Sequence, residues 1–194
     1  MAVHQARVKE SAIELLARQP GEWLLEAGVG TAWAFGRIVA VTGGHRAIGL
    51  DVATGMLDVA CDAIAQRAPG ERPELMLGDG ARLPFRDGAL DCVLCTYTLD
   101  VLPSESITPV LVELRRALRD GGRIVVAGLT DGEGGDAAFS EDWRARYIAD
   151  PEYFGGARPL QARPHLVEAG FEVIERHYSG GDAGWPSEIV LARR

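Results

Sequence analysis

The sequence predicts an α/β fold in which helices cover both faces of a doubly wound, mostly parallel sheet of seven strands. Two observations support this prediction. Through residues 1–129, short apolar runs alternate with longer amphipathic segments, which is the pattern of buried parallel strands joined by helices. The last two apolar runs are joined by a glycine-rich loop instead of a helix, which indicates an antiparallel hairpin at the C-terminal end.

Strands are expected where an apolar run is bounded by turn residues. The first run leads directly into Gly28-Val29-Gly30, the form of a buried strand that enters a tight turn. The seven expected strands are residues 23–27, 47–51, 75–77, 89–96, 123–129, 171–178 and 187–192.

Helices are expected between these strands, where apolar residues recur at helical spacing between capping and breaking residues. Pro20-Gly21 ends the first helix, Thr54 caps the third, and Asp120-Gly121-Gly122 ends the fourth. The expected helices are residues 3–19, 31–41, 54–67, 107–118 and 160–169, with a short one near 141–148.

Residues 130–159 interrupt this alternation, because they are rich in Gly and Asp and form a long excursion after the fifth strand. The excursion carries the aromatic residues Phe139, Trp143, Tyr147, Tyr153 and Phe154. Its place at the strand ends suggests an aromatic lid over an apolar or ring-containing ligand, although packing on the sheet would explain the same residues. We treat residues 1–194 as one domain.

The composition of the chain indicates where the protein works and which partners it excludes. With 47% hydrophobic and 25% charged residues, the chain has the composition of a soluble globular protein, and no apolar run is long enough to span a membrane. The net charge of −8 argues against nucleic acid as a partner. Three cysteines and no secretory leader favour the cytoplasm. Cys92 and Cys95 share one expected strand, which predicts packing and not a metal site.

The single lysine of the chain, Lys9, excludes several mechanisms. Schiff-base chemistry, a phosphate-loop lysine and a Tyr-x-x-x-Lys dehydrogenase pair all need a lysine in the middle of the chain. Residues 42–49 superficially match the glycine turn of short-chain dehydrogenases, but they precede a strand and have Ala47 where that turn has glycine.

Glycines and carboxylates gather at the expected strand ends. Residues 26–32, Glu-Ala-Gly-Val-Gly-Thr-Ala, close the first strand and let a ligand approach the backbone. Trp33 stands where a dinucleotide-binding turn has Gly or Ala. Asp51 and Asp79 end the second and third strands, and the spacing of Asp51 from the turn is typical of an acidic residue that binds ribose. Three acids would oppose a pyrophosphate but suit a nucleoside that carries a sulfonium and an ammonium group.

These residues resemble the class I S-adenosylmethionine-dependent methyltransferases, and among them the small-molecule ubiquinone/menaquinone-biosynthesis methyltransferases. The resemblance lies in residues 25–31, 49–57, 78–85, 113–123 and 166–173. It implies a Rossmann-like fold, S-adenosylmethionine as cofactor and methyl transfer to a small-molecule acceptor. Separately from the resemblance, a homodimer is the assembly that we consider. By that resemblance, Glu26, Gly28 and Gly30 hold the methionine end, Asp51 the ribose, Met56 or Leu57 the adenine face, Asp79 with Gly80 the adenine edge, and Thr96 and Tyr97 border the methyl group.

Ala32 departs from the family, which often has a third glycine there. Its methyl group crowds the turn only if this residue adopts a positive φ.

No catalytic base can be chosen among His165, His177, Tyr97, Asp100, Tyr147 and Tyr153, and methyl transfer can proceed by positioning alone. Two other functions stay open: a non-catalytic protein that binds S-adenosylmethionine or S-adenosylhomocysteine, and a nicotinamide-dependent oxidoreductase, which Trp33 and the missing lysine disfavour.

Overall fold

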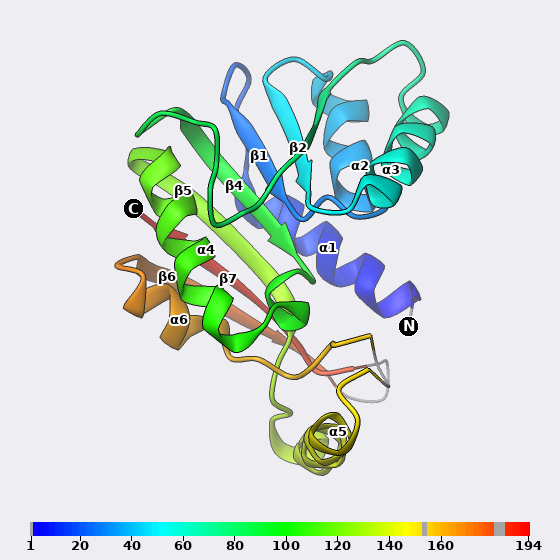
Figure 1. Cartoon of the computed structure of the whole chain (residues 1–194), viewed down its shortest axis with the longest axis vertical. Helices are drawn as coiled ribbons and strands as arrows, with labels where there is room; N and C mark the ends of the chain where they lie inside the picture. The colour runs from blue at the N-terminus through cyan, green and yellow to red at the C-terminus, as the bar shows by residue number, and fades with distance from the viewer. Residues whose placement is uncertain (1, 153–154, 181–184) are drawn as a thin grey trace.

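A seven-stranded sheet with the order β3-β2-β1-β4-β5-β7-β6 forms the centre of the molecule (Figure 1). The computed structural model describes residues 2–152, 155–180 and 185–194. Strands β1 to β5 pair in parallel, and β7 pairs antiparallel with both β5 and β6. The expected fold class and terminal hairpin are therefore confirmed. The strands are β1 (Leu24–Ala27), β2 (Ala47–Asp51), β3 (Glu74–Leu77), β4 (Leu90–Thr96), β5 (Leu118–Leu129), β6 (Glu172–Ser179) and β7 (Ser187–Arg193).

Helices cover both faces of this sheet. The helices are α1 (Ala2–Leu16), α2 (Trp33–Thr42), α3 (Thr54–Arg67), α4 (Ser104–Ala117), α5 (Ala137–Ala149) and α6 (Ala162–Glu168), with short 3-10 turns η1 (Leu99–Val101) and η2 (Gly134–Asp136). One apolar core joins α1, α2 and α3 to the sheet, and a second joins α4 and α6 to its other face. Alternate residues of one strand serve the two cores, as Leu24 and Leu25 do in β1.

Three expected boundaries differ from the structure for local backbone reasons. The first helix ends at Leu16, not residue 19, because Ala17 leaves the helical conformation with φ 47°. Leu118 is already extended and pairs with Leu90, so β5 begins five residues earlier than expected and contains the glycines assigned to the helix stop. Thr54 is the first residue of α3 instead of its cap, and the cap residue Ala53 has no side-chain hydrogen bond.

The excursion after β5 contains η2 and α5 and lies beside the carboxyl ends of the parallel strands (Figure 1). Helix α5 is longer than the expected residues 141–148. Trp143 is buried on it, stacks edge-on against Trp185 with ring centroids 4.4 Å apart, and donates a hydrogen bond from Nε1 to the Ala157 carbonyl at 3.1 Å. Tyr153 and Phe154 fall outside the described residues.

Cys92 and Cys95 are buried in β4, and both are free thiols, as is the exposed Cys61. The expected packing role of the pair is confirmed. Burial raises the pKa of both buried thiols to about 12, so neither is a nucleophile at neutral pH. Within the described residues, no group of His, Cys, Asp and Glu side chains could hold a metal ion, and no helix is long and apolar enough to cross a membrane.

Candidate functional site

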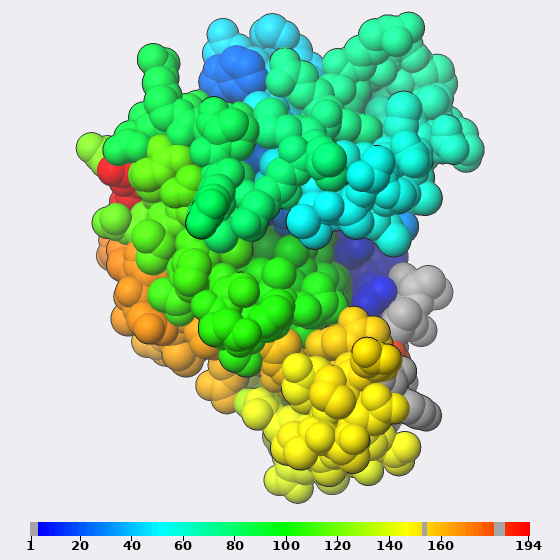
Figure 2. All heavy atoms as spheres, in the orientation of Figure 1, coloured from blue at the N-terminus to red at the C-terminus, as the bar shows by residue number. Residues whose placement is uncertain are grey.

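A cavity of about 420 Å³ opens at the carboxyl ends of β1 to β4, where ligands of doubly wound folds bind. We call it the carboxyl-edge cavity. Figure 2 shows the hollow between the cyan residues that follow β2 and the green residues that begin α4. Its lining comprises Ala27, Gly28, Gly30, Leu50, Asp51, Val52, Gly78, Asp79, Gly80, Ala81, Cys95, Tyr97, Thr98, Val101, Leu102, Ser106 and Val110.

Six of the ten residues expected in the site line this cavity: Gly28, Gly30, Asp51, Asp79, Gly80 and Tyr97. Glu26 and Thr96 lie behind the wall and are buried. Met56 and Leu57 stand on the first turn of α3 and do not line the cavity; Leu57 packs partly into the core, whereas Val52 lines the cavity. No motif in the sequence marks Val101, Leu102 or Val110, which form an apolar wall of the cavity from η1 and α4.

The glycine turn brings backbone against the cavity. Gly28 has φ 75°, and a Cβ atom placed there would lie 2.3 Å from Thr98 Oγ1, so only glycine fits. Gly30 has φ 50° but open space around it. Ala32 adopts φ 53°, which is the condition under which its methyl group strains the turn, and this side chain is fully buried.

Asp51 and Asp79 hold the turns that surround the cavity. Asp51 Oδ2 accepts a hydrogen bond from the Gly30 amide at 2.8 Å, and its Oδ1 accepts one from the Ala53 amide at 3.0 Å. Asp79 Oδ1 accepts from the Ala81 amide at 2.8 Å. Each carboxylate oxygen has two lone pairs, so both residues keep acceptor capacity for hydroxyl or amino groups of a ligand.

Glu26 is an unusual carboxylate, because it is only 1% exposed at the end of β1. Thr96 Oγ1 donates to Glu26 Oε1 at 3.4 Å, whereas Oε2 has no partner among the described residues. Burial raises the pKa of Glu26 to about 8, and the nearby charge of Lys9 acts in the opposite direction. An unpaired buried carboxylate oxygen costs stability and indicates a site for a cationic group.

Lys9 comes to this end of the site from α1, a helix distant in sequence. Its side chain is half-buried, and Nζ lies 5.5 Å from the centroid of the Tyr97 ring. Burial lowers the pKa of Lys9, while Glu26 and Asp100 counteract that shift. No local signal in the sequence places Lys9 near residue 26.

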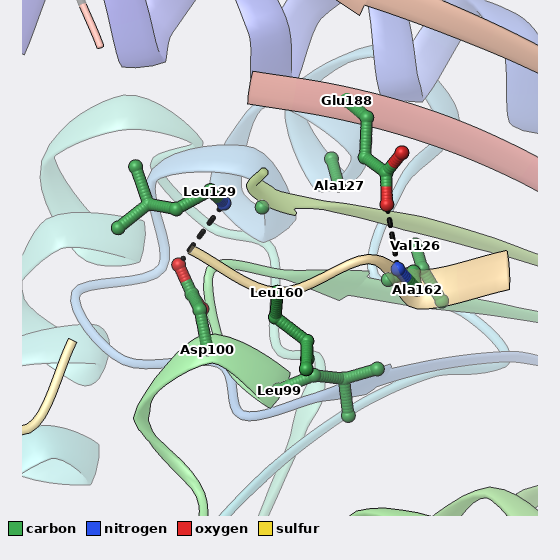
Figure 3. Close-up of a pocket in the computed structure, with 9 residues that line it drawn as sticks. Leu99, Asp100, Val126, Ala127, Leu129, Leu160, Ala162 and Glu188 are labelled. Carbon is green, nitrogen blue, oxygen red and sulfur yellow. Dashed lines mark hydrogen bonds between the residues drawn. The ribbon is translucent and has the colours of Figure 1, made fainter. Parts of the chain in front are cut away.

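Asp100 is buried in η1 and serves the fold rather than the cavity. Its Oδ2 accepts from the Leu129 amide at 3.2 Å, and burial raises its pKa to about 6. Figure 3 shows it across a small, separate internal cavity from Glu188, whose Oε1 accepts from the Ala162 amide at 2.6 Å. These two carboxylates fix the end of β5 and the start of α6.

Among the candidate bases within the described residues, only Tyr97 lines the carboxyl-edge cavity. Its hydroxyl is 3.1 Å from Ser187 Oγ, and burial raises its pKa to about 12, so it stays protonated at neutral pH. His177 forms an exposed pair with Glu175, and His165 lines a separate groove. Tyr147 lies beneath Arg158, and Tyr153 is outside the described residues.

Comparisons with known proteins agree with this geometry. The family model described as "Methyltransferase domain" matches residues 24–122. Malonyl-[acyl-carrier protein] O-methyltransferase of Serratia marcescens is 37% identical over 139 residues, which cover 70% of this chain and 51% of that protein. Demethylmenaquinone methyltransferase of Beutenbergia cavernae is 32% identical over 124 residues, covering 61% and 45%. The chain thus spans about half the length of these relatives.

Solved structures share the fold at low sequence identity. Magnesium protoporphyrin IX methyltransferase from Synechocystis, solved with bound S-adenosylhomocysteine, has a TM-score of 0.74 at 21% identity, covering 99% of this chain and 84% of that one. The [4+2]-cyclase SpnF has a TM-score of 0.76 at 20% identity, covering 97% and 81%. The family model covers half of the chain, and it includes the glycine turn, Asp51 and Asp79. The chain therefore belongs to the methyltransferase domain family, among the class I S-adenosylmethionine-dependent methyltransferases.

Proposed function

We propose that the chain transfers a methyl group from S-adenosylmethionine, the cofactor of its family, to a small-molecule acceptor. The observation that carries the proposal is the carboxyl-edge cavity, where close backbone approach at Gly28 meets the carboxylates of Asp51 and Asp79. A sulfonium nucleoside fits this chemistry, because acidic groups attract its positive charges and accept from its hydroxyl and amino groups. A pyrophosphate would be repelled by the same groups.

S-adenosylmethionine, when bound, supplies an electrophilic methyl group on its sulfonium. In our proposal, Asp51 accepts from the ribose hydroxyls, Asp79 and Gly80 contact the adenine edge, and Glu26, Gly28 and Gly30 hold the methionine end. Met56 or Leu57 was predicted to cover the adenine face, and we add Val52 because it lines the cavity next to Asp51. Thr96 and Tyr97 remain the residues predicted to border the methyl group.

In this proposal, positioning of the acceptor and exclusion of water accelerate methyl transfer, and no residue acts as a dedicated base. Tyr97 stays protonated at neutral pH, and Asp100 accepts from the Leu129 amide and does not line the carboxyl-edge cavity. An acceptor fixed in line with the methyl group reacts through proximity, which is worth several orders of magnitude in rate. The acceptor then releases its own proton to water.

The excursion of residues 130–159 is proposed to cover the acceptor. Trp143 holds α5 against Trp185 and Ala157, so it fixes the segment beside the strand ends. Trp143→Ala is expected to raise the KM for the acceptor about 10-fold or more while the dissociation constant for S-adenosylhomocysteine changes less than about 3-fold. Equal losses in both measurements would assign Trp143 to the fold alone.

Thermal unfolding with separate ligands tests the cofactor proposal. A ligand at about 100 times its dissociation constant stabilises the fold by about 2.7 kcal/mol, which raises the midpoint by roughly 2–4 °C per kcal/mol for a domain of this size. We expect shifts with S-adenosylmethionine and S-adenosylhomocysteine and none with NAD. A shift with NAD alone would instead support a nicotinamide-dependent oxidoreductase.

The likeness to the cyclase SpnF keeps a second function in view, because this fold also occurs in a protein named for a different reaction. A chain that binds the cofactor without methyl transfer would show the same thermal shifts. Formation of S-adenosylhomocysteine with any acceptor from a small-molecule panel separates the two. We further propose that the protein works in the cytoplasm and binds no nucleic acid. We also propose a homodimer, which light scattering of the purified chain would test.

A further inference from the structure

A polar groove of about 430 Å³ lies apart from the carboxyl-edge cavity and shares no lining residue with it. It forms where the segment between α5 and α6 runs back past the start of α4 (Figure 1). Its volume is in the range of pockets that bind small molecules. We call it the Arg158 groove, and its polar lining comprises Ser104, Asp131, Arg144, Arg158, Gln161 and His165.

Arg158 carries a buried positive charge that no carboxylate neutralises directly. Its side chain is only 9% exposed, and its guanidinium donates to two neutral acceptors, the Asp100 carbonyl at 3.4 Å and Ser104 Oγ at 3.1 Å. It also lies over the Tyr147 ring, 5.4 Å from the centroid. Within the described part of the chain it forms no ion pair. A guanidinium has more N–H donors than these acceptors use, and a buried charge usually has a counter-ion.

The carboxylates around this groove are already engaged with other groups. Asp131, the acidic residue in the described lining, is paired with Arg144 and accepts from Gln161 Nε2 at 2.8 Å. Asp100 interacts with the charge of Arg158, but its carboxylate accepts from the last amide of β5 and faces the small internal cavity. The charges of Arg144 and Asp131 cancel each other, so Arg158 gives the wall of the groove its uncompensated positive charge.

Other groups that favour an anion surround this charge. Ser104 is the first residue of α4, a helix of 14 residues, so the positive end of the helix dipole lies at the groove. Glu105 in the same turn is exposed and does not line the groove. His165 lines it from α6, and its buried Nδ1 has no hydrogen-bond partner among the described residues. Arginine, hydroxyl groups and helix N-termini are common ligands of phosphate, which accepts hydrogen bonds from several directions.

We propose that the Arg158 groove binds a phosphate group, which accepts hydrogen bonds from the Arg158 guanidinium and from the Ser104 hydroxyl. Ser104 Oγ accepts from Arg158, so its own proton is free to be donated to a ligand. Arg158 belongs to the excursion and Ser104 to α4, so a bound phosphate bridges these two segments. Inorganic phosphate and a phosphate ester share this chemistry, and their relative affinities distinguish them. The site does not depend on the proposed methyl transfer.

Calorimetry with three anions at constant ionic strength measures the site. The probes are inorganic phosphate, glycerol 3-phosphate and acetate. We expect both phosphates to bind, and acetate to bind at least about 10-fold more weakly because it carries a single charge and fewer acceptor oxygens. Tighter binding of glycerol 3-phosphate assigns the groove to a phosphate ester, and equal affinities assign it to the free ion. Acetate that binds as tightly as phosphate, or no binding of either phosphate, would overturn the proposal.

Four variants test the residues that carry the site. Arg158→Met is expected to weaken phosphate binding about 10–100-fold, the range for loss of a charge-assisted hydrogen bond. Arg158→Lys keeps the charge and should restore part of the affinity, and Ser104→Ala should weaken binding about 3–10-fold. Arg163→Met removes an exposed positive charge from α6 and should leave the affinity unchanged. If Arg158→Met does not fold, wild-type affinity in both Arg158→Lys and Ser104→Ala contradicts the assignment.

Saturation with S-adenosylhomocysteine locates the phosphate. The Arg158 groove and the carboxyl-edge cavity share no lining residue, so the phosphate dissociation constant should change less than about 2-fold. Competition between the two ligands would put the phosphate in the carboxyl-edge cavity and overturn the proposal. A protein that binds phosphate in this groove but no S-adenosylhomocysteine would contradict the proposed function and leave the phosphate site intact.

Discussion

At the scale of single residues, the glycine turn shows which glycine the fold requires. Gly28 and Gly30 both have positive φ, but only Gly28 faces another residue at close range. Gly28→Ala is expected to lower the free energy of unfolding by about 2–4 kcal/mol, because left-handed strain adds to a clash with Thr98. Gly30→Ala should cost only about 1–2 kcal/mol from strain. Urea denaturation compares the two, and equal losses would show that the contact with Thr98 relaxes freely.

Because Glu26 is buried, its protonation should make the free energy of unfolding depend on pH. Its folded pKa of about 8 exceeds its ordinary value of 4.5, so the folded state binds the proton more tightly than the unfolded state. The contribution of Glu26 to stability is therefore fully present below about pH 4.5 and is lost as pH rises through about 8. Asp100 acts in the same direction, but only up to about pH 6.

Glu26→Gln tests this expectation in the interval where Asp100 no longer titrates. Between about pH 6 and 8, the ligand-free variant should show a flatter profile and, at pH 8, a higher free energy of unfolding by roughly 1–4 kcal/mol. Chemical denaturation at several pH values measures it. A variant with the slope of the wild-type protein would contradict the assignment of that slope to Glu26.

At the scale of elements, one arginine joins the end of α1 to the sheet. Arg123 on β5 donates to the carbonyls of Leu16 and Ala17 and forms a two-armed pair with Glu22. Because both partners of this pair are largely buried, the loss of Arg123 leaves unpaired groups behind. Arg123 thereby helps to hold the helix that carries Lys9.

Arg123→Met is therefore expected to lower the free energy of unfolding by roughly 2–4 kcal/mol at neutral pH. The matched control is Arg119→Met on the same strand, whose pair with Asp91 is half-exposed and should contribute only about 0–1 kcal/mol. The Arg123 pair lowers the pKa of Glu22, so its stabilisation is present above pH 4.5 and is lost as pH falls through that lowered value. The difference between the two variants should therefore shrink in acid.

At the scale of the whole molecule, the cysteines report on cooperative unfolding. Cys61 is exposed, whereas Cys92 and Cys95 lie in the central strand β4 with their thiol pKa raised to about 12. A disulfide reagent at pH 8 should titrate one thiol quickly in the native protein and three in guanidinium chloride. A second fast thiol under native conditions would mean that β4 opens locally without global unfolding.

The sequence by itself determined the features that depend on neighbouring residues. Alternating apolar runs and turn residues specified the strands and helices, and each strand end specified which residues meet at the carboxyl edge. Gly28, Gly30, Asp51 and Asp79 therefore came together as expected. The hairpin was also predictable, because its loop is too short for a crossover helix.

Only the tertiary structure decided the contacts between distant segments. It placed β7 between β5 and β6, put Ala32 in a left-handed conformation, and closed the cavity with η1 and α4. It also brought Lys9 to Glu26, although no pattern links residue 9 to residue 26. The physical reason is that hydrophobic burial, which is non-directional, fixes how helices pack on the sheet, and a polar residue at the edge of a buried face reaches whatever that packing places beside it.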